Sequence, residues 1–201
     1  MLTKKQIRII SVFNEDVNKE LTFKQLKEKS NQKSNNFVQK ALKDFRKWDL
    51  IKTRKIGNIK IYSLNLENNL SMSYLNLINE SEIKKNKLPK EILKEIQGKI
   101  LRYTEFFILI VFGSYAKNKS NNNSDLDIAI IIEDEQIKKE IIPLLETIKR
   151  REILKIDYHV FPRKEFLEML KADYENLGKQ INKNKIIYYG FIEYCYLLKN
   201  E

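Results

Sequence analysis

The stretch Phe112–Ile132, FGSYAKNKSNNNSDLDIAIII, joins a Gly-Ser pair to an unbroken aliphatic run through a segment rich in Lys and Asn. Two aspartates, Asp125 and Asp127, stand one residue apart where the aliphatic run begins. Continuous apolar runs of this length are typical of strands that are buried on both faces. Because side chains alternate along a strand, both carboxylates leave the same face of it. The chain therefore places two acidic groups at the entry to its predicted core.

Two further apolar runs lie on either side of this stretch. Residues 105–113 (EFFILIVFG) end at a glycine, and residues 153–161 (ILKIDYHVF) carry Asp157 in their middle. We expect both to be buried strands, in which an unpaired carboxylate costs several kcal/mol. Asp157 would then join the first two aspartates from a neighbouring strand. Three converging carboxylates repel one another unless a cation lies between them, and hard oxygen ligands suit Mg²⁺.

A structural explanation accounts for part of this pattern. Residues 122–125 (NNSD), which begin with Asn122, are all turn formers and could simply lead into a strand. A turn explains Asp125, but it explains neither Asp127 nor Asp157. The catalytic interpretation is therefore favoured, and it predicts a phosphoryl-transfer site with one or two divalent ions.

The order of these residues resembles the polymerase-β-type nucleotidyltransferase superfamily. Gly113-Ser114 is followed after ten residues by Asp125-x-Asp127, and a third aspartate lies on a later predicted strand. Within that superfamily, residues 91–201 look most like the small nucleotidyltransferase domains of archaea and bacteria, which include the antitoxin partners of HEPN-domain toxins. The resemblance implies a C-terminal α/β domain with a small mixed sheet flanked by helices. The fold class expected for the whole chain is α+β.

The resemblance also implies a role for each residue of the motif. Those implied to bind nucleotide are Gly113, Ser114, Lys117 and Ser124. Those implied to bind Mg²⁺ and to catalyse transfer are Asp125, Asp127 and Asp157. The implied reaction moves a nucleoside monophosphate, first of all AMP from ATP, to an acceptor hydroxyl and releases pyrophosphate. The acceptor is left open between a protein side chain, for which a HEPN-type toxin is the implied partner, an RNA end and a small molecule.

One departure from the family pattern lies in the loop. Members often have Arg-Gly after the Gly-Ser-x-Ala start, whereas Lys117 and Asn118 stand there in this chain. Lysine keeps the positive charge but loses the bidentate fork of arginine. Asparagine tolerates the left-handed backbone conformation better than other non-glycine residues. We therefore expect the loop to keep its shape while binding nucleotide less tightly.

Residues 1–65 predict three short helices followed by a β-hairpin. Apolar residues recur at helical spacing in the first and third predicted helices, and Thr22 with Gln25 forms a capping-box pattern at the second. Two β-rich runs then flank Gly57-Asn58, a two-residue hairpin signal with glycine first. This order resembles a winged helix-turn-helix domain, in which the third helix enters the major groove and the hairpin touches the DNA backbone.

The charge distribution supports a polyanionic partner for this segment. Residues 1–65 carry 16 Lys and Arg against 6 Asp and Glu, a net charge of +10, whereas residues 66–201 carry 22 against 21. Such asymmetry is typical of a segment that faces nucleic acid. The residues predicted to contact DNA are Asn36, Gln39, Lys40, Lys43 and Lys47 in the third helix, with Arg54 and Lys55 in the hairpin. A protein-docking or dimerisation module is the alternative.

Other features of the sequence argue against several classes of protein and of metal site. Cys195 and His159 are the single cysteine and histidine, which excludes an intrachain disulfide and argues against a His/Cys metal site. His159 lies two residues after Asp157, so it either lines the predicted site or packs as a structural histidine. No apolar run approaches a membrane span, and no signal-peptide cleavage pattern follows the start, so we expect a cytoplasmic protein.

The predicted organisation has three parts, namely a winged helix domain (1–65), a helical linker (66–90) and a nucleotidyltransferase domain (91–201). Taken together, these parts predict a Mg²⁺-dependent nucleotidyltransferase that also binds DNA. The alternative is a DNA-binding transcriptional regulator whose nucleotidyltransferase domain only senses nucleotide or pairs with a partner protein. Pyrophosphate release distinguishes the two.

Overall fold

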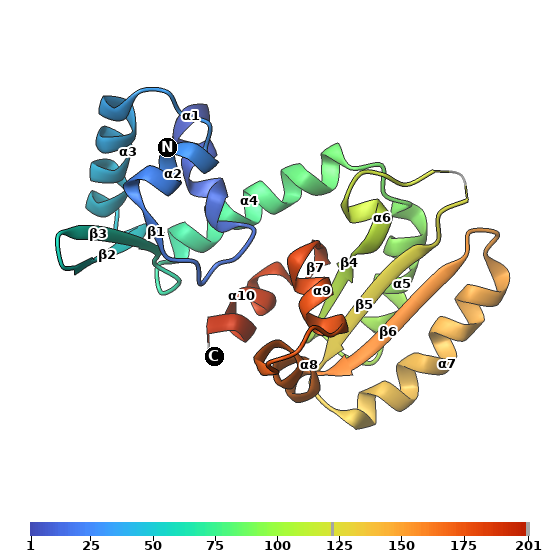
Figure 1. Ribbon diagram of the computed structural model, residues 1–201. Helices are drawn as coiled ribbons and strands as arrows, with labels where there is room; N and C mark the ends of the chain where they lie inside the picture. The colour runs from blue at the N-terminus through green and yellow to red at the C-terminus, as the bar shows by residue number, and fades with distance from the viewer. Residues whose placement is uncertain (122, 200–201) are drawn as a thin grey trace. The chain divides into compact units, whose positions relative to one another are not determined.

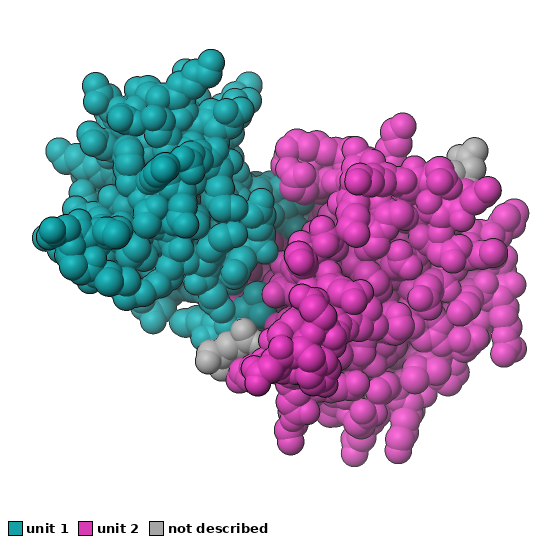
Figure 2. All heavy atoms as spheres, viewed as in Figure 1, with its two compact units in different colours: residues 1–80, 198–200 teal, residues 81–197, 201 magenta. Residues whose placement is uncertain are grey.

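The computed structural model of the chain describes residues 1–121 and 123–199 and is shown in Figure 1. Asn122, one of the predicted turn residues, lies outside the described residues. The chain folds into two compact units, which Figure 2 colours separately. Unit 1 comprises residues 1–80 and the segment from 198, and unit 2 comprises residues 81–197. The division into segments 1–65, 66–90 and 91–201 stays a prediction.

Unit 1 contains three helices and a three-stranded sheet ahead of a longer helix. Capping boxes begin its first two helices, and the predicted pair is confirmed because the Thr22 backbone N–H donates to Gln25 Oε1 at 2.8 Å. The elements, in chain order, are α1 (Lys4–Ile10), the 3₁₀ turn η1 (Ser11–Phe13), β1 (Leu21–Thr22), α2 (Phe23–Lys29), α3 (Asn35–Lys47), β2 (Ile51–Ile56), β3 (Ile59–Leu64) and α4 (Asn69–Lys85), whose residues from 81 onward belong to unit 2.

The hairpin of unit 1 forms around the predicted turn. Strands β2 and β3 pair antiparallel with Ile56 opposite Ile59, so the loop consists of Gly57 and Asn58 alone. Gly57 has a φ of +56°, which fits a two-residue turn with glycine first. The short strand β1 pairs with the other side of β3, and the sheet order is therefore β1-β3-β2.

Helix α3 buries one stripe and exposes the other. Its buried residues are Val38, Ala41, Leu42 and Phe45. The sequence also predicts Trp48 in this stripe, but Trp48 is only half-buried because it is the C-cap residue, after the last helical turn. Asp49 follows with a φ of +55°, and this left-handed residue turns the chain into β2.

Unit 2 is built around a four-stranded mixed sheet whose order is β6-β5-β4-β7. Strand β4 pairs antiparallel with both β5 and β7, whereas β5 and β6 are parallel. The predicted small mixed sheet flanked by helices is confirmed, and the chain is a mixed α+β protein. Its elements after α4 are α5 (Lys90–Ile100), β4 (Phe107–Val111), α6 (Gly113–Ala116), β5 (Leu126–Ile132), α7 (Glu135–Arg151), β6 (Ile156–Pro162), α8 (Arg163–Lys171), α9 (Leu177–Lys183), β7 (Ile186–Tyr189) and α10 (Phe191–Lys199).

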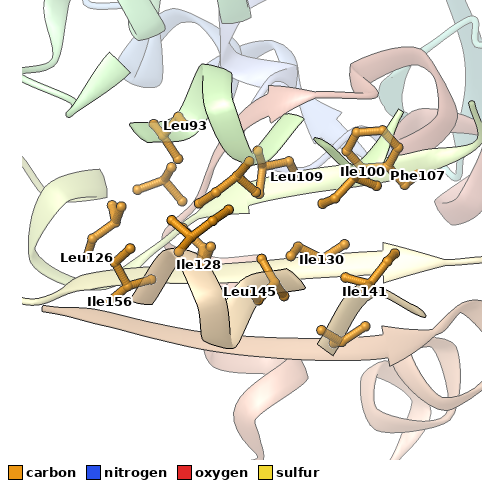
Figure 3. Close-up of a cluster of buried hydrophobic side chains, with 14 of the residues drawn as sticks. Leu93, Ile100, Phe107, Leu109, Leu126, Ile128, Ile130, Ile141, Leu145 and Ile156 are labelled. Carbon is orange, nitrogen blue, oxygen red and sulfur yellow. The ribbon is translucent and has the colours of Figure 1, made fainter. Parts of the chain in front are cut away.

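The hydrophobic core of unit 2 fills one face of this sheet, as Figure 3 shows. Helices α5 and α7 contribute side chains such as Leu93 and Leu145, and β5 contributes Leu126, Ile128 and Ile130. Because side chains alternate along β5, Asp127 points to the opposite face of the sheet from this core. Ala129 and Ile131 share the face of Asp127 and are buried, so only the start of β5 on that face, at Asp127, is open to a ligand.

Two further observations concern the helices. The sequence predicts a helix over residues 91–103, which Gly98 weakens at its centre. Helix α5 is nevertheless continuous through Gly98 and ends at Ile100, and its buried face holds three large aliphatic residues. No helix within the described part of the chain is both long and apolar enough to cross a membrane.

Candidate active site

Strand pairing brings two of the predicted catalytic aspartates side by side. Asp127 is the second residue of β5, and its register partner on the parallel strand β6 is Asp157. Asp125 precedes β5 by one residue and is exposed. All three carboxylates therefore lie around the first residues of two neighbouring parallel strands.

The expected burial of Asp157 is wrong. Its side chain is 58% exposed, because β6 is an edge strand and Asp157 is only its second residue. A burial penalty therefore cannot explain why an aspartate stands at this position. The position of Asp157 is explained instead by its pairing with Asp127, which is half-buried on the central strand β5.

The turn after β4 lies directly on the side chain of Asp127. Gly113 has a φ of +65°, and a Cβ atom added there would stand 1.8 Å from Asp127 Oδ2. The backbone N–H of Ser114 donates a hydrogen bond to the Asp127 carboxylate. Glycine is therefore required at position 113 both by the backbone conformation and by the space that the carboxylate occupies.

The loop after Ser114 keeps the shape expected of it. Asn118 has a φ of +53°, so it occupies the left-handed conformation expected for asparagine. The Lys119 N–H then donates to the Ser114 carbonyl at 2.9 Å and closes the turn. The Lys117 side chain is exposed, and no hydrogen bond of the Ser114 hydroxyl occurs within residues 1–121 and 123–199. Both side chains are thus available to a ligand.

Ser124 has a local partner. Its hydroxyl accepts a hydrogen bond from the Asn121 N–H at 2.9 Å and lies 3.3 Å from Asn121 Oδ1. Such bonds hold a turn in shape. The predicted role of Ser124 in nucleotide binding stays a prediction, and its present contacts stabilise the loop that leads into β5.

The electrostatics of the site centre on Asp127. Burial raises the pKa of the Asp127 carboxyl above its ordinary value, and the carboxylates of Asp157 and then Asp125 raise it further. The N–H of Ser114 and the side chain of His159 act in the opposite direction, but the net shift is upward. The three carboxylates therefore repel one another, and a cation placed among them would relieve that repulsion.

The donor set fits Mg²⁺, although the side chains do not form a closed cage. Carboxylate oxygens are hard ligands, and Asp125, Asp127 and Asp157 supply them around one position of the sheet. Over the described residues, no three His, Cys, Asp or Glu side chains are gathered tightly enough to form a metal cluster as they stand. An ion would therefore have to draw these carboxylates together.

His159 lines the same face of the sheet. It stands two residues beyond Asp157 on β6, and its Nε2 atom lies 3.6 Å from Asp157 Oδ2. Its ring stacks on Phe161 with centroids 5.9 Å apart and lies 6.1 Å from the ring of Phe112. Sequence reasoning missed these two aromatic neighbours. The two-residue alternation of β6 could have found Phe161, but the approach of Phe112 depends on strand pairing.

The residues predicted to contact DNA are exposed on unit 1. They are Asn36, Gln39, Lys40, Lys43, Lys47, Arg54 and Lys55. Arg54 is not free, because its guanidinium forms a bidentate pair with the Glu20 carboxylate, with 2.7 Å between Nε and Oε1. The lysines of α3 form no ion pair within the described ranges. The cations of α3 are therefore more accessible to a polyanion than the arginine of the hairpin.

Unit 1 also holds a basic hollow that sequence reasoning missed. It has a volume of about 520 Å³ and lies where α1 meets the start of α3. Its cations are Lys5, Arg8 and Lys33. They come from two segments that are 25 residues or more apart, so the amino-acid pattern along either segment could not have shown that they meet.

Comparison with known families agrees with the motif in unit 2. Residues 94–189 match the model of the family described as Polymerase beta, Nucleotidyltransferase, and the matched segment contains Gly113, Ser114 and the three aspartates. The match supports the assignment of this domain to the polymerase-β-type superfamily, and nucleotidyl transfer as its general activity. It does not reach residues 1–65, so their likeness to a winged helix stays a prediction. A comparison with curated proteins found no match.

Proposed function

We propose that unit 2 is a Mg²⁺-dependent nucleotidyltransferase that uses ATP. The observation that carries this proposal is the register of Asp127 with Asp157, beside a turn in which Gly113 leaves just enough space for the Asp127 carboxylate. Bound Mg²⁺ would neutralise the charge of the triphosphate, and the three aspartates would hold it. Gly113 lets the backbone approach the phosphates, and the Ser114 hydroxyl donates to a phosphate oxygen.

The proposed reaction is an in-line displacement at the α-phosphorus. The acceptor oxygen forms a new bond to this phosphorus while the bond to the bridging oxygen of the β-phosphate breaks. The electron pair leaves with pyrophosphate, and the hydroxyl proton passes to a carboxylate oxygen of Asp157. A protein hydroxyl, such as a tyrosine or serine of a HEPN-type toxin, is the leading acceptor. An RNA end and a small molecule are the others.

Replacement of Ser114 by alanine tests the nucleotide site. We expect Ser114→Ala to weaken ATP binding and pyrophosphate release by about 10- to 100-fold, since a hydrogen bond to a charged group contributes roughly 1.5–3 kcal/mol. Its N–H still donates to Asp127, so the thermal midpoint should not change. Titration calorimetry and a pyrophosphate assay with Mg²⁺ measure both effects. Unchanged ATP binding by the variant would show that this hydroxyl does not face the triphosphate. If the parent protein binds ATP but releases no pyrophosphate, the alternative of a DNA-binding regulator would be favoured.

We further propose that unit 1 binds duplex DNA through the exposed face of α3. Three lysines that have no carboxylate partner among residues 1–121 and 123–199 occur there with Asn36 and Gln39, two side chains that can reach base edges. The basic hollow adds Lys5, Arg8 and Lys33 near the start of α3. Phosphate contacts would come from the lysines, and they would make binding strongly dependent on salt.

Neutralising α3 tests this second proposal. The triple variant Lys40→Gln/Lys43→Gln/Lys47→Gln should bind a mixed-sequence duplex more weakly, and the slope of log K against log salt should become shallower by about 2–3. Fluorescence anisotropy at several salt concentrations measures this slope. The matched control, Lys24→Gln/Lys27→Gln/Lys29→Gln on α2, removes the same charge from another helix of the unit. An equal loss in both variants would show that general charge, not α3, holds the DNA.

A further inference from the structure

The tip of the β2–β3 hairpin presents two isoleucines to solvent. Ile56 and Ile59 flank the two-residue turn directly and are cross-strand partners. Their exposed fractions are 52% and 56%, so about half of each residue is in contact with water. Paired exposed isoleucines at the end of a projecting hairpin form a small apolar edge.

The fold of unit 1 does not account for this edge. The core-facing positions of β3 are those of Tyr62 and Leu64, which are buried, and alternation places Ile59 on the other face. Ile56 pairs with Ile59 and so shares that other face. Polar residues normally occupy the solvent face of a half-buried hairpin, and a polar pair here would remove no packing from the core.

The other face of the same tip carries two like charges. Lys55 and Lys60 are direct cross-strand partners, both are exposed, and neither forms an ion pair in the described part of unit 1. Like charges directly opposite each other destabilise a hairpin. The tip is therefore apolar on one face and doubly positive on the other, and each face lacks a partner within the described residues of the unit.

Duplex DNA supplies partners for both faces at once. The phosphates that border the minor groove attract the lysine ammonium groups, and apolar wedges such as isoleucine insert between base steps within that groove. Pyrimidine–purine steps such as TpA unstack at the lowest cost. The apolar edge is only two side chains wide and ends in a tight turn, so the tip alone, and not the whole ribbon, would have to enter the groove.

We infer that the hairpin tip enters the minor groove of duplex DNA, where Ile56 and Ile59 wedge open a base step and Lys55 and Lys60 contact the flanking phosphates. The inference rests on the proposed DNA binding of unit 1 and adds to it a specific contact and a deformation. It makes unit 1 a protein that bends DNA as well as binding it.

The test uses the full chain and a mixed-sequence duplex with 2-aminopurine next to a central TpA step and a fluorophore at each end. The parent protein should increase the 2-aminopurine fluorescence and bring the two ends closer. Ile56→Thr/Ile59→Thr should lose both signals and bind roughly tenfold more weakly. The reason is that the exposed apolar surface of the two isoleucines, about half of each residue, is no longer there to be buried against DNA. Threonine is β-branched, so the strands should persist.

Salt dependence separates the wedge from the phosphate contacts. The isoleucine variant removes no cation, so its slope of log K against log salt should equal that of the parent. Lys55→Gln/Lys60→Gln should instead make the slope shallower by about 2. Leu77→Gln is the matched apolar control, because Leu77 is 65% exposed on α4 and lies outside the hairpin. Its DNA binding and 2-aminopurine signal should equal those of the parent.

Three other results would each contradict a different part of this inference. If the parent binds the duplex and the isoleucine variant keeps both fluorescence signals, the wedge is wrong while DNA binding by α3 stands. If the parent does not bind duplex DNA, the DNA proposal falls and the wedge falls with it. If the isoleucine variant loses affinity for phosphatidylserine vesicles but not for the duplex, the tip docks on a membrane surface and the inference is wrong.

Discussion

Asparagine in place of Asp127 should abolish nucleotidyl transfer, with a loss of at least about a thousandfold in turnover, which corresponds to roughly 4 kcal/mol. The negative charges of Asp157 and Asp125 both act on Asp127, since both raise the pKa of its carboxyl. Removing its charge should therefore weaken Mg²⁺ binding and not only one contact. Asp157→Asn should have the same effect on transfer, because the two residues share a register position. The pyrophosphate assay with ATP and Mg²⁺ measures both losses.

The same substitution should not destabilise the metal-free protein. Asparagine Oδ1 can still accept the Ser114 N–H, and the carboxylate repulsion is relieved. The folded-state pKa of Asp127 is raised, so the parent loses stability as the pH rises through and above the ordinary aspartate value. The variant should therefore have an equal or higher thermal midpoint at pH 7 in EDTA, and this advantage should fade below about pH 4.

A control variant separates these effects from a general change in charge. Asp173→Asn alters an exposed aspartate in the loop between α8 and α9 and should change neither transfer nor stability. Transfer activity that survives Asp127→Asn would contradict the proposed site. A lower thermal midpoint for Asp127→Asn in EDTA would show instead that the carboxylate is a structural acceptor.

Much of the architecture of unit 2 is predictable, because it depends on local patterns. The apolar run ending at Gly113 and the run beginning after Asp125 both form strands, since continuous aliphatic segments have few other stable environments. The left-handed turn at Asn118 is also predictable, because it follows from the conformational preference of a single residue. These features need no information about distant parts of the chain.

Features that depend on strand pairing are harder to predict from the sequence. That Asp157 would approach Asp127 follows from the motif, but its 58% exposure follows from the position of β6 at the sheet edge. Edge or central position is decided by the order of strands, which the pattern within one strand does not contain. Ser124 is similar, because its hydroxyl bonds to a loop residue only once the turn has formed. Sequence reasoning thus predicted that these aspartates would be neighbours, but not how exposed they are.

Alanine in place of Gly113 should damage both stability and transfer, for two separable reasons. The φ of +65° is unfavourable for any residue with a Cβ atom, by about 1–2 kcal/mol. The new Cβ would also stand 1.8 Å from Asp127 Oδ2, so the carboxylate or the turn must move. We expect the free energy of unfolding to fall by at least about 2 kcal/mol. Transfer should fall by about a hundredfold or more, since misplacement by about 1 Å has an effect of that size.

A matched glycine and a double-mutant cycle separate these two reasons. Gly57→Ala has a similar φ of +56° but nothing within 4 Å of its new Cβ, so urea denaturation should show the backbone cost alone. In an Asp127→Ala background the obstructing carboxylate is absent and only the Cβ atom of residue 127 remains, 3.2 Å from the new Cβ, so Gly113→Ala should cost much less than in the parent and only slightly more than Gly57→Ala. The difference between the two backgrounds is the coupling energy between the turn and the carboxylate. A coupling near zero would mean that the turn does not position Asp127, and the proposed link between the Gly-Ser motif and the metal ligands would then be wrong.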